Sequence, residues 1–186
     1  MNRLTLTLTL AALGLSAGCH ALKHALEPAH HHSDAEAVVE ACYDAIDDLL
    51  GQHQDREDLQ RMLVSTVVDV NDVNRTTMFG RVVREFLSAR LTRCNIDVIH
   101  PTVREDQLLV QSSGQFLLSR DVANLALDYN ARTALVSTYA PLNESVIVSM
   151  KLVSTVENST LAATDFVLVR SAAVEEMLTS VVGWTR

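Results

Sequence analysis

The sequence predicts a single compact α/β domain with a mixed sheet, an early strand–helix–strand crossover and a late antiparallel meander. Two observations lead to this prediction. Between residues 62 and 100, an apolar β-branched run, an amphipathic helix and a short strand follow one another. Between residues 134 and 169, three strand-like segments are separated by polar turns. A chain of this length can bury one core of ordinary size.

The first expected element is a helix over residues 34–50. Asp34 can cap its start and Gly51 follows its end. Its apolar residues recur at helical spacing: Val38, Cys42, Ile46 and Leu49. Residues 62–70 (MLVSTVVDV) are nearly continuously apolar and rich in β-branched side chains. Such a run is typical of a central strand that is covered on both faces.

The clearest helix is expected over residues 78–93. One apolar stripe runs along it, made of Met78, Phe79, Val82, Val83, Phe86, Leu87 and Leu91. Residues 95–100 (NIDVIH) then favour a strand that Pro101 ends. A strand, a helix and a strand in this order indicate a crossover between two parallel strands.

The second half of the chain predicts mostly strands. A short edge strand is expected at residues 108–111, and a helix at residues 119–130 with Ser119 as its N-cap. Close spacing favours an antiparallel meander of strands at residues 134–139, 145–153 and 161–169. A terminal helix is expected at residues 171–182.

The first eighteen residues predict a signal peptide that is removed after Gly18. Arg3 gives a positive start, an apolar run follows, and small residues precede Cys19. Residues 15–19 (LSAGC) resemble the lipobox of bacterial lipoproteins, in which the cysteine thiolate takes up lipid. We therefore expect lipid on Cys19, a histidine-rich tether over residues 19–33 and a folded domain over residues 34–186. The alternative is an ordinary signal peptide with a chance cysteine.

The net charge and the lack of catalytic motifs narrow the classes of function that this chain could have. Lys and Arg number 15 against 23 acidic residues, so removing Arg3 with the signal peptide changes the side-chain balance from −8 to 14 − 23 = −9. Such an acidic protein is a poor nucleic-acid binder. The sequence lacks a phosphate loop, a nucleophile elbow, a zinc-protease motif and a dinucleotide fingerprint. We expect no catalytic residues, no cofactor and no metal site.

Two cysteines remain once Cys19 carries lipid. An exported pair can form a disulfide in an oxidising compartment, which would join Cys42 and Cys94. Cysteine also packs as a small hydrophobic residue, so two free thiols are the other alternative. The sequence leaves both alternatives open.

Three motifs resemble those of one protein family. Residues 78–81 (MFGR) begin the central helix, residues 114–121 (GQFLLSRD) precede a strand at 134–139 (ALVSTY), and residues 161–166 (LAATDF) form a late strand. In this order and spacing they resemble the FlgO-type family of flagellar outer-membrane lipoproteins. The resemblance covers roughly residues 35–169, nearly all of the expected domain.

This resemblance implies a non-catalytic lipoprotein that supports flagellar assembly or stability at the outer membrane and is needed for motility. It implies lipid anchoring at the outer membrane, facing the periplasm, with basal-body or ring proteins, or further copies of the chain, as partners. A candidate contact segment is provided by Gly114, Phe116, Ser119, Arg120 and Asp121. The alternative function is a lipoprotein assembly factor of another envelope complex, for secretion or cell-wall synthesis.

Overall fold

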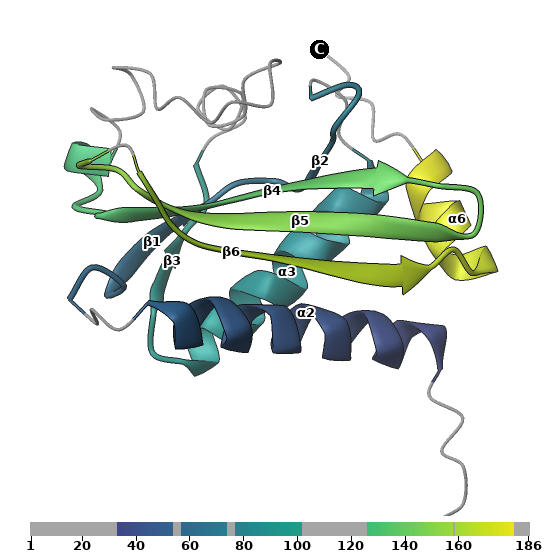
Figure 1. The fold of residues 1–186 in the computed structure, drawn as a ribbon, viewed down its shortest axis with the longest axis horizontal. Helices are drawn as coiled ribbons and strands as arrows, with labels where there is room; N and C mark the ends of the chain where they lie inside the picture. The colour runs from purple at the N-terminus through teal and green to yellow at the C-terminus, as the bar shows by residue number, and fades with distance from the viewer. Residues whose placement is uncertain (1–32, 54–56, 74–76, 102–125, 158, 181–186) are drawn as a thin grey trace, which may run out of the picture. The chain divides into compact units, whose positions relative to one another are not determined.

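The computed structural model describes residues 33–53, 57–73, 77–101, 126–157 and 159–180 (Figure 1). Helices are α2 (Asp34–Gln52), α3 (Met78–Arg93) and α6 (Ala172–Thr179). Strands are β1 (Arg61–Val64), β2 (Val68–Asp69), β3 (Asp97–Ile99), β4 (Thr133–Pro141), β5 (Ser145–Ser154) and β6 (Thr160–Val169). These elements form one mixed sheet with helices, which confirms the predicted α/β fold class.

The sheet has a parallel half and an antiparallel half. Its strand order is β3-β1-β4-β5-β6, and β2 also pairs with β4. β1 runs parallel to both β3 and β4, as expected for a crossover that contains α3. β4, β5 and β6 pair in antiparallel fashion, which confirms the predicted meander.

One face of the sheet carries the main core. Met62 of β1, Leu135 of β4 and Met150 of β5 pack there against apolar residues of α2, α3 and α6. Because side chains alternate along a strand, Leu63 and Ala134 face the other side and join a smaller buried cluster. The central strands are therefore covered on both faces, as the continuous apolar run of residues 62–70 predicts.

That run is not one strand, contrary to the prediction. β1 ends at Val64 and β2 begins at Val68, while their partners in β4 are Leu135 and Thr138. Four steps along the β1–β2 segment therefore match three steps along β4. The extra residue makes an irregularity of the kind found in a β-bulge, and it splits the run into two strands.

The start of α2 also corrects the sequence analysis. Ser33, and not Asp34, is the N-cap: its hydroxyl accepts from the Glu36 amide at 3.3 Å, and the Glu36 carboxylate accepts from the Ser33 amide at 2.8 Å. This reciprocal capping box satisfies two amides that the first helical turn leaves free. Asp34 instead places its acidic side chain in the first turn.

At its other end, α2 contacts the last strand of the sheet. The Gln52 side chain donates to the Ala163 carbonyl oxygen at 3.0 Å and accepts from the Ala163 amide at 3.3 Å. Ala163 lies in β6, which pairs with β5 alone in the strand order. The side-chain amide of Gln52 therefore forms hydrogen bonds with both the backbone N–H and the backbone carbonyl of Ala163.

Parts of the prediction lie outside the described residues. The expected edge strand at 108–111 and the start of the helix at 119–130 fall within residues 102–125, although residues 126–128 are helical. Over the ranges given above, no helix has both the length and the apolar character needed to cross a membrane.

Candidate functional site

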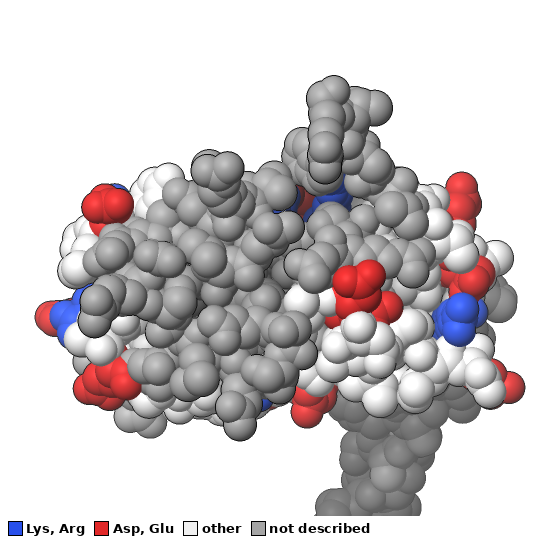
Figure 2. All heavy atoms as spheres, turned by 90° about the horizontal axis from the view of Figure 1, so that it is seen from above, with Lys and Arg blue, Asp and Glu red and all other residues white. Residues whose placement is uncertain are grey.

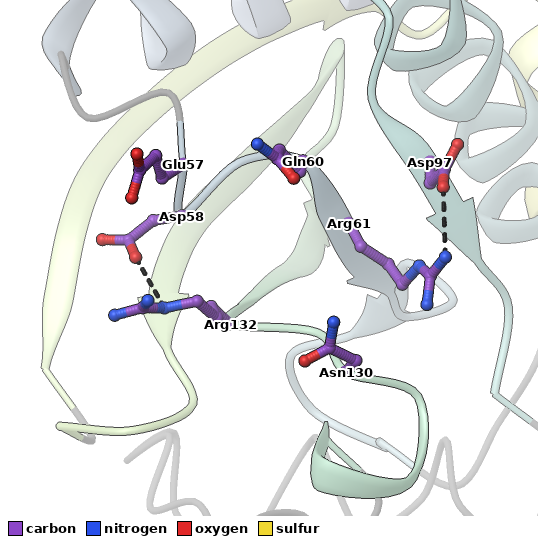
Figure 3. A pocket seen from close by; sticks show the side chains of 7 residues that line it. All are labelled: Glu57, Asp58, Gln60, Arg61, Asp97, Asn130 and Arg132. Atoms are coloured by element: carbon purple, nitrogen blue, oxygen red, sulfur yellow. Dashed lines mark hydrogen bonds and ion pairs between the residues drawn. The ribbon is translucent and has the colours of Figure 1, made fainter.

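A polar pocket lies where three parallel strands begin. Its volume is about 320 Å³. Figure 3 shows its lining side chains: Glu57, Asp58, Gln60, Arg61, Asp97, Asn130 and Arg132. They belong to the starts of β1 and β3 and to the segments just before β1 and β4. Because the three strands are neighbours and parallel, their starts meet at one end of the sheet.

Two ion pairs cross the pocket. Arg132 donates through Nε to Asp58 Oδ1 at 2.8 Å, and Arg61 Nη2 lies 3.4 Å from Asp97 Oδ2. Arg61 also donates through Nη1 to the Tyr129 carbonyl oxygen at 3.0 Å. The Asp97 side chain is 73% exposed and that of Arg132 is 58% exposed, so both charged groups reach solvent.

Asn130 completes the pocket through an unusual backbone conformation. Its φ angle is 51°, a left-handed value that asparagine tolerates better than most residues. The turn is closed by hydrogen bonds from the Asn130 amide to Leu127 and from the Ala131 amide to Ala126. The Asn130 side chain lies between the two arginines in Figure 3.

An apolar groove of about 270 Å³ adjoins this pocket, and Asn130 and Arg132 line both hollows. The other groove residues are Ala126, Leu127, Ala131, Thr155 and Val156. Leu127 is 76% exposed and Val156 is 69% exposed. Large apolar side chains beside a polar pocket are a common composition for a binding surface. We call the two hollows together the end surface.

The end surface is held by hydrogen bonds between segments that are distant in the sequence. Thr155 donates its hydroxyl to the Ala131 carbonyl oxygen at 2.8 Å and its amide to Arg132 at 2.9 Å. Thr133 donates its hydroxyl to the Asp58 carbonyl oxygen at 3.1 Å. These contacts join the groove and the pocket to residues 131–133, where β4 begins.

The structure describes only the two cysteines among the site residues expected from sequence. Gly18, Cys19 and the contact segment with Gly114, Phe116, Ser119, Arg120 and Asp121 lie outside the described residues. Cys42 is buried in α2, and Cys94 is half-buried at the C-cap of α3. Both thiols are free in the structure.

Cys42 is expected to resist alkylation in the folded protein. Burial raises the pKa of its thiol from 9.0 to about 12, and only the thiolate reacts. At pH 8, iodoacetamide should label Cys94 in the native chain, and Cys42 only after urea is added, as peptide mass spectrometry can measure. Fast native labelling of Cys42 would contradict its burial. A Cys42–Cys94 disulfide would instead leave both residues unlabelled until a reductant is added.

The same thiol predicts a pH dependence of stability. The pKa of the Cys42 thiol is higher in the folded protein than in the unfolded chain. Below pH 9.0 the thiol is neutral in both states, so its contribution to stability is fully present there. As the pH rises from 9.0 toward 12, ionisation in the unfolded state lowers the free energy of unfolding. A Cys42→Ala variant should show a shallower loss over this range in urea titrations, and an unchanged slope would contradict the assignment.

The sequence analysis missed the residues of the end surface. Asp58, Arg61, Asp97 and Arg132 carry no local motif and lie far apart in the chain. One signal was available, because each lies at or just before the start of a strand. Parallel pairing of the strands that begin at Arg61 and Asp97 would have placed these two residues side by side, and the structure pairs them in register.

A comparison with protein-family models decides the family. The model described as "FlgO protein" matches residues 43–173, which is more than half of the chain. This chain belongs to the FlgO family. The family membership confirms the resemblance that was drawn from residues 78–81, 114–121 and 161–166.

The fold also resembles solved structures of the LpoB C-terminal domain. The LpoB C-terminal domain from Escherichia coli matches with a TM-score of 0.52 at 14% identity, covering 70% of this chain and 97% of that one. The corresponding domain from Salmonella enterica matches with a TM-score of 0.51 at 15% identity, with the same coverage. At such identities the likeness shows a shared fold alone. No curated protein matches this chain.

The FlgO motif at the start of α3 has a structural role. Phe79 is fully buried, and its ring meets that of Tyr139 edge-on, with 5.0 Å between the ring centroids. The Tyr139 hydroxyl lies 3.1 Å from the hydroxyl of Thr77, the N-cap of α3. Gly80 lies against the backbone of Val67. These contacts join the start of α3 to the sheet.

Proposed function

We propose that this protein is a non-catalytic outer-membrane lipoprotein that supports assembly or stability of the flagellum where it crosses the outer membrane. Membership of the FlgO family is the observation that carries the proposal. Cys19 in its lipobox would hold lipid, and residues 19–33 would form the tether to the domain at 34–186. The domain would face the periplasm and contact basal-body or ring proteins.

The proposed role is that of a scaffold. The Cys42 thiol is buried and its pKa is raised, which disfavours the thiolate needed for covalent catalysis. Lipid anchoring would raise the local concentration of the domain, so that weak contacts with a partner could suffice.

Loss of the lipid is expected to impair motility as much as loss of the gene does. A strain without this gene should swim poorly in soft agar while growing normally, and the wild-type gene should restore swimming. The Cys19→Ser gene should fail to restore it, because the unlipidated protein would leave the membrane. Cys94→Ser is the matched control, since it keeps Cys19 and changes a half-buried thiol. Normal swimming and normal flagella without the gene would contradict the proposal.

A second candidate function is that of an assembly factor for another envelope complex. The fold is shared with LpoB, and a fold alone does not determine function. Sedimentation of envelopes with intact basal bodies would separate the two functions. Wild-type protein that sediments with basal bodies supports the flagellar scaffold. Protein that stays in the outer membrane but is absent from basal bodies supports the other complex.

A further inference from the structure

We propose that the end surface binds a partner segment in which an aliphatic side chain and a basic side chain lie two residues apart. The aliphatic side chain would enter the groove beside Leu127 and Val156, and the basic one would enter the pocket beside Asp97. The inference deepens the proposed function, because it takes the lipid tether from it and adds the chemistry of the partner.

The position of the end surface favours contact with a partner. The tether joins the domain at Ser33, where α2 begins. Figure 1 shows α2 running from the side where α6 lies to the side where β1 and β4 begin. A helix of 19 residues spans about 28 Å. The end surface therefore lies at the end of the domain opposite Ser33, the residue at which the tether would join it.

Charge favours a basic group in the pocket. Its lining residues include three acids, Glu57, Asp58 and Asp97, against two arginines. Arg132 already donates to Asp58, whereas Asp97 contacts Arg61 at 3.4 Å and remains largely exposed. Figure 2 shows acidic and basic side chains next to one another at the end that lies left in Figure 1. The chain as a whole carries a charge of −8, which attracts a cationic partner.

The adjoining groove supplies the apolar part of the contact. Leu127 and Val156 are more exposed than an apolar side chain would be in the core, and covering them would remove apolar area from water. Asn130 and Arg132 line both hollows, so one ligand can fill both. In an extended segment, residues i and i+2 point to the same side, about 6.6 Å apart. Because the two hollows adjoin, we assign one side chain of such a pair to each of them.

Blocked hexapeptides test this assignment directly. One carries leucine and lysine two residues apart, a second has glutamate for the lysine, and a third has alanine for the leucine. Each is titrated into the full mature chain, kept soluble by Cys19→Ser, and backbone amide shifts are followed by NMR. The first peptide should shift Leu127, Asn130 and Arg132 saturably, and the other two should bind at least about threefold more weakly.

Matched variants of the protein test whether the peptide binds at the two hollows. Asp97→Asn and Val156→Ser change exposed residues of the end surface, and each should weaken the first peptide about threefold to fivefold. Asp165→Asn and Val167→Ser are the controls, because they change exposed residues of β6 that line neither hollow. Both controls should bind like the wild type.

Several results would overturn the inference. Equal or tighter binding of the glutamate peptide would remove the charge assignment, and saturable shifts confined to β6 would place the contact elsewhere. An absence of saturable shifts with the first peptide would reject the site. These outcomes do not depend on motility, so the end surface can fail while the flagellar role holds, and the flagellar role can fail while the peptide binds.

Discussion

Replacing Gly80 with alanine is expected to cost about 4 kcal/mol or more of folding free energy, among the largest effects of a single change. A Cβ atom at this position would lie 1.9 Å from the carbonyl oxygen of Val67 and 3.1 Å from its carbonyl carbon. Both atoms belong to the backbone between β1 and β2, so no side-chain rotation can relieve the overlap. The helix or the strand would have to move. Urea unfolding followed by circular dichroism measures the loss.

Gly51 provides the matched control for this change. It also lies in a helix, but a Cβ atom there would meet no other heavy atom within 4 Å. Alanine at position 51 should therefore leave stability unchanged or raise it by about 0.5–1 kcal/mol, the usual gain over glycine in a helix. Equal stabilities of the two variants would show that close approach to Val67 does not explain the glycine.

Replacing Phe79 with alanine is expected to cost about 3–5 kcal/mol. Its side chain is 0% exposed and belongs to the main core. Removing the ring leaves a cavity and ends the edge-on contact with Tyr139, whose ring plane is inclined at 70°. Because the neighbouring Thr77 contacts the Tyr139 hydroxyl, the start of α3 should lose order as well.

The neighbouring residue supplies the control for Phe79. Met78 lies in the same turn of α3 and is 44% exposed, so Met78→Ala should change stability by less than about 0.5 kcal/mol. The midpoint of urea unfolding should fall strongly for Phe79→Ala and remain near that of the wild type for Met78→Ala. A similar midpoint for both variants would mean that the ring contributes little to the core.

Local patterns account for the elements that the sequence predicts well. The helix expected at residues 78–93 has the observed bounds, because an apolar stripe runs along it, the Thr77 cap precedes it and the left-handed Asn95 follows it. The three late strands agree with the expected ones to within two residues at each end. Alternation of buried residues such as Val146 and Val148 is visible from sequence alone.

Tertiary contacts account for what sequence could not predict. The break between β1 and β2 depends on the unequal pairing with β4, which no local pattern encodes. The end surface depends on strand order, since Arg61 meets Asp97 only once β1 and β3 are neighbours. Asn130 acquires its role from a turn that places its side chain between residues of two other segments. Residues 102–125, which include the contact segment expected from sequence, are not described.

With the lipid anchor proposed above, the side-chain amide of Gln52 would have a further consequence. Lipid anchors confine molecules to a surface, so neighbouring copies meet often, and an exposed edge strand is a template for pairing between chains. At Ala163 the amide of Gln52 mimics a short piece of neighbouring strand, since it satisfies the same donor and acceptor that a second chain would use. A single glutamine thus occupies one point of the β6 edge at which a second chain could pair.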